Sequence, residues 1–207
     1  MIDSKDEKPK ELDAAGQNPK ERLLDVAERL FSLKGFASVT LREIGNELSL
    51  SHASLYDHFP GGKEELFIAV TKRNILRHGE ALKVRLDAAN GNIQSILLSI
   101  AEWFLVQPPL DLIRMAQSDM PVLKPQDARK LMDLMHEQIL LRLQDVLQEA
   151  DESGTIHCAN PALVAGAFVG MIESFHSMPE FAVRSSRLDM AGEMIDILLR
   201  GMDYRSL

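Results

Sequence analysis

Hydrophobic side chains recur with a helical period along most of the chain. Between residues 19 and 34 they fall on one face at i, i+1, i+4, i+7 and i+8, from Leu23 to Phe31. From Ile93 to Leu105 they recur at steps of 3, 1, 3, 1, 3 and 1. No strand-like alternation of useful length interrupts this pattern. The sequence therefore predicts an all-α fold with about nine helices.

Glycine, proline and capping residues predict where these helices begin and end. Gly35 stands where the first helix should stop, because glycine is favoured just after a helix C-terminus. Thr40 with Glu43 three residues later forms a capping-box pattern, which opens a short second helix. The expected helices cover 19–34, 41–48, about 52–58, Lys63 into the 80s, 93 to just before Pro108, about 110–118, 126–151, 160–178 and 187–203.

Charge and composition divide the chain into three parts. Residues 1–18 are polar without an apolar period, so we expect a mobile arm that is not a secretory signal. Residues 1–89 carry 14 Lys and Arg against 15 Asp and Glu, a balance of −1, whereas residues 90–207 carry 9 against 16, a balance of −7. A small nucleic-acid-binding head over 19–65 on an acidic body over 66–207 would have this distribution, although many ordinary two-part proteins would share it.

The sequence gives little support to a membrane protein or a disulfide-linked one. No segment approaches the roughly 18 uninterrupted apolar residues of a membrane span. The single Cys158 excludes an internal disulfide and a cysteine-based zinc site, and it fits a reducing cytoplasm. We therefore expect a cytoplasmic protein with no membrane association.

An enzyme would need a reactive group with partners, and few candidates occur. The adjacent His157-Cys158 pair suggests a thiol and a base, but neighbouring side chains on a loop usually diverge. His136 beside Glu137 lacks the i, i+4 histidine pair of a zinc helix, and His176 near Glu173 lacks a third ligand. The sequence therefore predicts no catalytic residue, no metal site and no cofactor.

The two short helices over 41–48 and 52–58 have the dimensions of a helix-turn-helix. A second helix of this kind presents its N-terminal end to a DNA major groove, where its dipole also favours a phosphate. The apolar positions that can form a small core between them are Ile44, Leu48, Leu50, Leu55 and Phe59. The positions that project from the remaining surface are Arg42, His52, Ala53, Ser54 and Tyr56.

The stretch "ERLLDVAERLFSLKGFASVTLREIGNELSLSHASLYDHFPGGKEELF" resembles the DNA-binding domain of tetracycline-repressor-like (TetR family) transcriptional regulators. The rest of the chain resembles that family only in the arrangement of its helices and in a few short segments of similar sequence. The positions that carry the resemblance are Ala27 to Phe31, Gly35-Phe36, Thr40, Ile44, Leu55-Tyr56, His58-Phe59 and Lys63-Glu64.

The resemblance implies double-stranded operator DNA as a partner and a role for eight residues at it. Four of them match phosphate-contacting positions of the family: Thr40, Tyr56, His58 and Lys63. Four match positions that touch base edges: Arg42, His52, Ala53 and Ser54. Simpler roles stay open, since Tyr56 could be a half-buried aromatic residue, His58 a helix C-terminal stabiliser and Lys63 a solvated cation.

Three features depart from the family pattern. Ser49 replaces the usual turn glycine, which predicts a left-handed backbone at some strain or a slightly different turn. Gly45 replaces the usual alanine, which should weaken the second helix by up to ~1 kcal/mol. The Pro60-Gly61-Gly62 link is one residue longer than the commoner spacing, which makes the reach of Lys63 harder to predict.

The resemblance also implies an effector cavity in the body and a homodimer. The cavity would take a small hydrophobic or amphipathic molecule, and the dimer would bind a pseudo-palindromic site. The candidate pocket residues, which are helical-core residues in the simpler interpretation, are Trp103, Phe104, Gln107, Met115, Met132, Met135, His136, Phe168, Met171 and Phe175. The candidate interface residues, which could instead pack within the chain, are Ala162, Ala165, Gly166, Gly170, Leu188, Ala191, Ile195, Leu198 and Met202.

These observations predict a ligand-responsive DNA-binding regulator, a repressor released from its operator when the effector binds. Two other interpretations remain open. One is an all-α enzyme or ligand carrier with a helix-turn-helix corner, and the other is a head that docks a protein instead of DNA. Salt-sensitive DNA binding separates the regulator from both.

Overall fold

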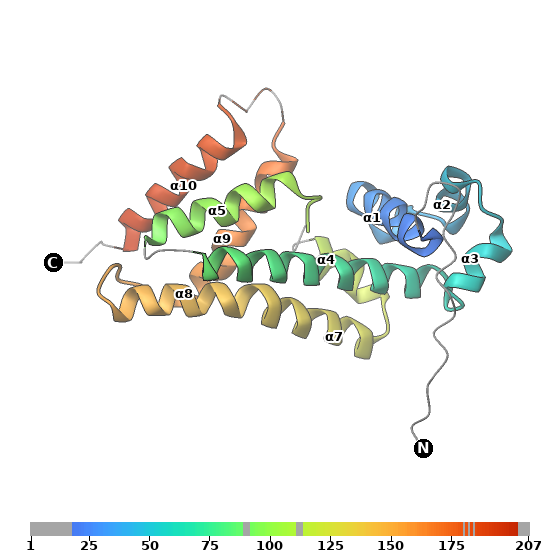
Figure 1. Cartoon of the computed structure of the whole chain (residues 1–207), viewed down its shortest axis with the longest axis horizontal. Helices are drawn as coiled ribbons and strands as arrows, with labels where there is room; N and C mark the ends of the chain where they lie inside the picture. Colours follow the sequence, from blue (N-terminus) through green and yellow to red (C-terminus); the bar gives the residue numbers. More distant parts are fainter. Residues whose placement is uncertain are drawn as a thin grey trace, which may run out of the picture. The chain divides into compact units, whose positions relative to one another are not determined.

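The computed structural model describes residues 18–88, 92–110, 114–179, 181, 183 and 185–202. These residues form nine α-helices and no strand, which confirms the all-α prediction (Figure 1). The predicted mobile arm lies outside the described residues except for Asn18. The helices are α1 (Pro19–Ser38), α2 (Leu41–Leu48), α3 (His52–His58), α4 (Gly62–Asp87), α5 (Ile93–Val106), α7 (Pro125–Met135), α8 (Leu141–Glu152), α9 (Pro161–Ser174) and α10 (Arg187–Met202).

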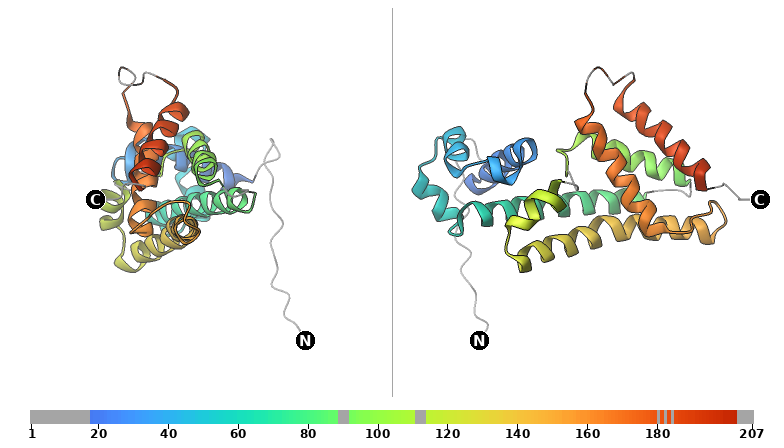
Figure 2. Two further views of the ribbon diagram at one scale, coloured as in Figure 1. Left: turned by 90° about the vertical axis from the view of Figure 1, so that its left-hand side faces the viewer. Right: turned by 180° about the vertical axis from the view of Figure 1, so that it is seen from behind.

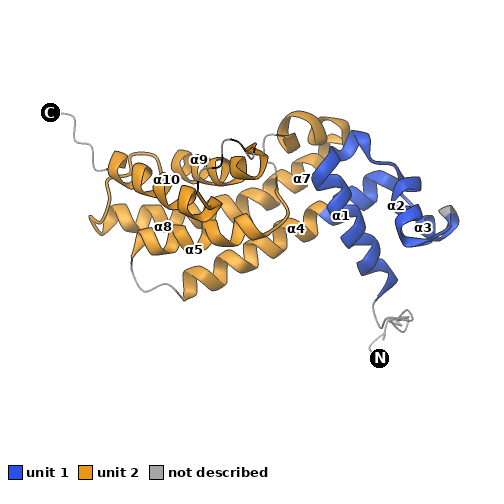
Figure 3. Cartoon of the chain, turned by 90° about the horizontal axis from the view of Figure 1, so that it is seen from above, with its two compact units in different colours: residues 1–70 blue, residues 71–207 orange. Residues whose placement is uncertain are grey.

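The chain forms two compact units, which Figure 3 distinguishes by colour. The first unit covers residues 1–70 and the second covers residues 71–207. We call them the head and the body. Helix α4 contributes its first nine residues to the head and the rest to the body, since the division follows Val70. The two units are described separately below.

Helix α1 opens the head with a side-chain cap and ends after a break. Asn18 accepts a hydrogen bond from the Lys20 backbone N–H at 2.9 Å, and Pro19 occupies the first helical position, where its missing N–H costs nothing. Gly35 has φ 75° and ψ 167°, and one further helical turn continues to Ser38. The predicted stop at Gly35 is therefore a kink inside α1, which only a residue without a Cβ adopts easily.

Aromatic rings form the centre of the head. Phe31 of α1 meets Phe67 of α4 edge to face, with ring centroids 5.1 Å apart. The ring centroid of Phe36 lies 5.0 Å from that of Phe67 and 6.2 Å from that of Phe31. Burying such a ring is worth roughly 1.5–3 kcal/mol. This cluster fixes the first turns of α4 against both parts of α1.

The body is a helical bundle in which α9 packs on α8 and α5, and α10 packs on α5. Helix α9 runs obliquely across its neighbours (Figure 2). Helices α7 and α8 are joined without a loop by a π-helical turn, His136–Leu140, so the predicted long helix over 126–151 is continuous apart from this turn. The side chains at the centre of this bundle are Leu97, Ile100, Phe104, Ile139, Leu143, Leu147, Phe168 and Ile172.

The predicted helix over 110–118 is the least regular part of the body. Leu110 is not helical, and residues 111–113 lie outside the described part of the chain. A π-helical turn, Met115–Asp119, and a 3-10 turn, Met120–Val122, follow. Pro121 cannot donate a backbone hydrogen bond, which accounts for the tightening of the chain there. Among the described helices, none combines the length and the apolar character that a membrane span requires.

Candidate functional site

Helix α2 begins with a reciprocal capping box. Thr40 Oγ1 accepts from the Glu43 backbone N–H at 3.2 Å, and the Glu43 carboxylate accepts from the Thr40 backbone. Glu43 also pairs with Lys34 of α1, and this hydrogen bond is the main cause that lowers the pKa of Glu43. A second ion pair joins Arg29 to Glu47. The predicted capping box is confirmed, and ion pairs tie α2 to α1 at both of its ends.

Of the two alternatives that the sequence left open for the turn after α2, a left-handed Ser49 or a different turn, the structure shows the left-handed residue. Ser49 has φ 55° and ψ 31°. The Leu50 N–H donates to the Gly45 carbonyl at 2.9 Å, and the Ser49 N–H donates to the Asn46 carbonyl at 3.3 Å. This pair of bonds is the Schellman motif, which satisfies carbonyls that a helix end leaves without partners. Serine adopts this left-handed conformation with the strain of its Cβ.

Gly45 marks the closest approach between α2 and the segment that follows it. A Cβ at this position would lie 3.1 Å from the Leu50 carbonyl oxygen and 3.2 Å from Leu55 Cδ1. These distances are shorter than ordinary van der Waals contact. Alanine would gain up to ~1 kcal/mol of helix propensity and would have to push α3 outward to do so.

Helix α3 is capped by Ser51, whose Oγ accepts from the Ser54 backbone N–H at 3.1 Å. Leu55 and Phe59 are buried in the head, whereas Tyr56 is 41% exposed. Ala53, three residues before Tyr56, is also exposed, so the two share an outward face. The helix therefore presents its N-terminal end and one face to solvent while its other face sets its position.

The structure brings most of the predicted DNA-contacting residues to the start of α2 and to α3. Thr40, Arg42, Ala53 and Tyr56 are exposed, and Ser54 and His58 are half-buried. His52 is the first residue of α3, and its side chain lies outside the described part of the structure. These positions lie on the two elements of a helix-turn-helix, which makes them candidates for one surface.

Lys63, the second residue of α4, contacts the end of α1. Its Nζ donates to the Ala37 carbonyl at 3.3 Å and lies 4.3 Å from the centroid of the Phe36 ring. Burial lowers the pKa of Lys63. Both contacts are with the last turn of α1, and the single hydrogen bond leaves the ammonium further donors for a phosphate.

The Pro60–Gly62 link turns the chain sharply into α4. Gly62 has φ 68° and donates its N–H to the Phe59 carbonyl at 2.8 Å. The Gly61 N–H donates to the Glu65 carboxylate at 2.6 Å. A Cβ on Gly62 would lie 3.5 Å from Tyr56 Cε1, so the tyrosine ring packs against this turn. The glycines allow a left-handed residue at the beginning of α4.

The predicted pocket residues do not share one kind of environment in the body. Phe104, Met135, Phe168 and Phe175 belong to the buried core, and Met115 is buried outside that cluster. Trp103, Gln107, Met132 and Met171 are half-buried, whereas His136 is exposed. Their role in effector binding stays a prediction.

His78 is a buried polar group that the sequence reasoning missed. Its Nδ1 accepts a hydrogen bond from Trp103 Nε1 at 3.2 Å. Its ring stacks on the ring of Phe104, with the two centroids 4.6 Å apart. Burial, with smaller contributions from the charges of Arg77 and His176, lowers the pKa of His78 to about 3. His78 Nε2 is buried without a hydrogen-bond partner among the described residues.

A sequence signal for His78 did exist. It stands three residues after Ile75 and four before Leu82, and both of these residues are fully buried. A histidine on the buried stripe of an amphipathic helix is usually a core histidine with satisfied hydrogen bonds. The unsatisfied Nε2 is what distinguishes it, and only the structure reveals that.

Some of the residues predicted for the dimer interface are buried inside this chain, and the others keep exposed surface. Ala165, Ala191, Ile195 and Met202 belong to the core of the same chain, because α10 packs against α5 and this side of α9 faces inward. The seam predicted along α10 is therefore largely an intrachain contact. The predicted residues that keep exposed surface are Ala162, Gly166, Gly170, Leu188 and Leu198.

The described residues contain no group of three or more His, Cys, Asp and Glu that could hold a metal ion. Cys158 is buried, and burial raises the pKa of its thiol. The neighbouring His157 is exposed, with its Nδ1 3.6 Å from the Asp151 carboxylate. A buried thiol of raised pKa is a poor nucleophile, so the surroundings of Cys158 do not favour a reactive thiol activated by His157.

Two family models match the chain. Residues 23–70 match the model described as bacterial regulatory proteins, tetR family. Residues 92–194 match the model described as AefR-like transcriptional repressor, C-terminal domain. The first match spans α2 and α3, and the second spans most of the body.

Curated relatives and solved structures are also similar. The chain is 47% identical over 49 residues to the HTH-type transcriptional regulator LmrA of Bacillus subtilis, a match that covers 24% of this chain and 26% of LmrA. A tetR-family regulatory protein from Rhodococcus RHA1 superimposes with a TM-score of 0.70 at 19% identity, covering 92% of this chain and all of that one. The structure of AibR in complex with isovaleryl coenzyme A and operator DNA superimposes with a TM-score of 0.71 at 19% identity. The match covers 87% of this chain and 97% of AibR.

Proposed function

Because the chain belongs to the tetR family of bacterial regulatory proteins, we propose that it is a ligand-responsive transcriptional repressor. It binds a pseudo-palindromic operator as a homodimer in the cytoplasm. A small hydrophobic or amphipathic molecule that binds the body releases it. The relatives are transcriptional regulators, which supports this function over an enzyme or a carrier.

The observation that carries DNA binding is the exposed face of α2 and α3. Arg42 and Ala53 are exposed on consecutive short helices, and the buried Leu55 and Phe59 hold α3 in place. An arginine fork can pair with the O6 and N7 of guanine, and an alanine methyl suits a thymine methyl. Tyr56 offers a hydroxyl to a phosphate, which would fix the register of the head on DNA.

The support for effector binding is the unsatisfied donor inside the body. Trp103 donates to His78 Nδ1, so the proton of the neutral ring is on Nε2, which faces no acceptor in the described structure. A buried donor without a partner costs about 1–3 kcal/mol. We assign this donor to an acceptor atom of the effector, with Phe104 and Trp103 packing against its apolar part.

The support for a homodimer is the small-residue stripe on α9. Ala162, Gly166 and Gly170 follow one another at intervals of four, and Leu163 beside them is 67% exposed. Apart from the backbone of α9 itself and the adjoining residues, no heavy atom of the described residues lies within 4 Å of a Cβ placed on either glycine. Small residues let a second helix approach closely, and a twofold dimer would place two heads about 34 Å, or a multiple of that, apart.

Helix α4 supplies the link between effector and operator. It begins in the head, where Leu66 and Phe67 are buried, and continues into the body, where His78 is buried. An effector that binds one arrangement of this helix better than another shifts the balance between them only by that difference in affinity. Equal affinity for operator DNA with and without the effector would reject this mechanism.

Two substitutions test the assignment of the DNA surface. Tyr56→Phe removes a phosphate contact, so it should weaken binding to all DNA sequences alike. Arg42→Ala should cost about 1–3 kcal/mol and relax the preference at one base pair. Binding is measured by fluorescence anisotropy on the operator and on single-base variants of it. If neither substitution alters binding, the DNA surface lies elsewhere on the head.

A further inference from the structure

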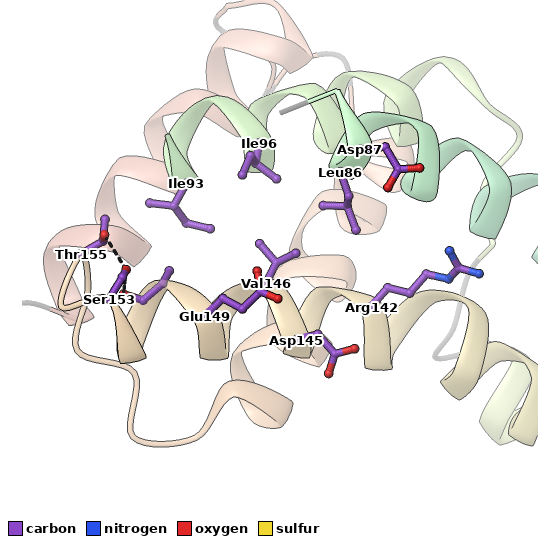
Figure 4. A pocket seen from close by; sticks show the side chains of 11 residues that line it. Leu86, Asp87, Ile93, Ile96, Arg142, Asp145, Val146, Glu149, Ser153 and Thr155 are labelled. Carbon is purple, nitrogen blue, oxygen red and sulfur yellow. Dashed lines mark hydrogen bonds between the residues drawn. The ribbon is translucent and has the colours of Figure 1, made fainter. Parts of the chain in front are cut away.

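The body contains a hollow that none of the preceding assignments uses. It has a volume of about 730 Å³ and lies where the end of α4, the start of α5 and one face of α8 meet (Figure 4). Ligand pockets commonly measure about 300–1,000 Å³, so the hollow is large enough for a small organic molecule. The apolar side chains that line it are Leu86, Ile93, Ile96, Val146 and Ala150. It does not include His78 or the residues around it.

Carboxylates surround this apolar lining. Asp87 comes from the end of α4, and Asp145 and Glu149 project from α8 along the same hollow (Figure 4). All three are exposed, and none of them forms an ion pair within the described residues. The only basic residue among those that line the hollow is Arg142, whose guanidinium donates to Gln138 Oε1 at 3.1 Å. The lining therefore carries three negative charges against one positive charge.

The carboxylates and the apolar lining together indicate what kind of molecule the hollow can bind. Carboxylates without a counter-ion attract a cation, and they repel an anion of the same shape. The apolar lining requires an occupant with hydrophobic surface to bury, which an inorganic ion lacks. No metal-binding group of His, Cys, Asp and Glu exists among the described residues either. A molecule that combines an apolar framework with one positive charge matches both features.

We propose that this hollow is a binding site for a small amphipathic organic cation. Its apolar part rests on Leu86, Ile96 and Val146, and its charge lies beside Asp145 and Glu149. The site is separate from the donor at His78, and the inference does not depend on which operator the head recognises.

The test compares two probes of the same shape and opposite charge. Tetraphenylphosphonium and tetraphenylborate are titrated into the full chain by isothermal titration calorimetry at moderate salt. We expect tetraphenylphosphonium to bind at least about tenfold more tightly than tetraphenylborate. Equal binding of the two probes, or no binding of the phosphonium, would overturn the proposal.

A pair of double variants localises the site. Asp145→Asn with Glu149→Gln removes two of the carboxylates without changing their size, and each exposed charge contributes a modest part of the attraction, so we expect about tenfold weaker phosphonium binding. Glu80→Gln with Glu102→Gln removes the same charge from exposed positions on α4 and α5 that do not line the hollow. This control should stay within about twofold of the parent chain.

The two double variants also separate a specific site from attraction by the net charge of −8. A specific site predicts a loss in the first double variant alone. Equal losses in both would attribute binding to the overall field of the protein, and the proposal would fail. Circular dichroism melting checks that the substitutions leave the fold intact, which their exposure leads us to expect.

Discussion

Ser49 holds the turn between α2 and α3 in a backbone conformation that costs free energy. Its φ of 55° puts the Cβ close to the following carbonyl, a strain of roughly 1–2 kcal/mol for a residue other than glycine. Ser49→Gly relieves this strain but adds freedom to the unfolded chain. We therefore expect the head to gain about 1 kcal/mol, measured as the free energy of unfolding in urea.

Ser49→Ala is the matched control for this prediction. It removes the hydroxyl and keeps the Cβ, so the strain remains and no gain is expected. An equal gain from alanine and glycine would mean that the hydroxyl, and not the backbone conformation, is unfavourable at this position.

His78 makes the stability of the body sensitive to acid. The pKa of an unfolded histidine is about 6.5, whereas burial lowers that of His78 to about 3 in the folded chain. Between these values the unfolded chain binds a proton that the folded chain does not. The contribution of His78 to the free energy of unfolding is therefore fully present above about pH 6.5. It decreases by about 1.4 kcal/mol for each pH unit as the pH falls toward about 3.

Urea unfolding at pH 7, 6 and 5 measures this slope. His78→Gln has no titrating group and still offers Trp103 an acceptor, so its stability should fall less steeply between pH 7 and 5 than that of the parent chain. His136→Gln removes an exposed histidine from the same body and should keep the parental slope. If the His78 and His136 variants have the same slope, the buried imidazole is not the source of the acid sensitivity.

At the scale of elements, helix positions followed from the hydrophobic period and the capping residues, whereas irregular backbone did not. Thr40 marked a helix start, and Gly35, predicted as a stop, marks a kink inside α1, because each acts through its own local chemistry. The π-helical turns at Met115–Asp119 and His136–Leu140 were not predicted, because none of the sequence patterns used above signals such a turn, and the second of them contacts α4 at Gly79.

Gly79 of α4 shows what such a contact requires. A Cβ there would lie 2.9 Å from Gln138 Cβ and 3.2 Å from the Gln138 carbonyl oxygen, in the π-helical turn. We expect Gly79→Ala to force these segments apart, which costs about 1–3 kcal/mol and exceeds any gain in helix propensity. Thermal unfolding of the body, followed by circular dichroism, measures the loss.

Gly192→Ala is the comparison for Gly79→Ala. The nearest atom to a Cβ at Gly192 is Leu98 Cδ1 at 4.0 Å, so alanine fits without displacement and should stabilise α10 by up to ~1 kcal/mol. Stabilisation by both substitutions would show that the contact between α4 and the π-helical turn is not tight.

At the scale of the whole molecule, the sequence predicted the helix-turn-helix more fully than the body. The residues of the head lie on two short helices with strong caps, so local rules place them together. The partners of α9 and α10 depend on how distant helices pack. For that reason Ala191 and Ile195, predicted for a partner surface, lie in the core of their own chain.

The remaining exposed stripe on α9 gives a direct test of the proposed dimer. Among the described residues outside the backbone of α9, no atom lies within 4 Å of a Cβ at Gly166, so a leucine there starts in open space and should block a close helix at that face. Sedimentation equilibrium should report a dimer for the parent and a monomer for this variant. Gln126→Leu adds the same side chain at an exposed position of α7 and should remain dimeric. A dimer that persists in Gly166→Leu would move the interface away from this stripe.

DNA binding by the head can be measured directly with the full chain. The full chain is titrated by fluorescence anisotropy against the DNA upstream of its own gene and against a shuffled duplex of equal composition, at several salt concentrations. We expect at least about 10³-fold tighter binding to the upstream DNA, with affinity for both duplexes falling steeply as salt rises. Equal affinity for the two duplexes, or binding that does not respond to salt, would contradict it.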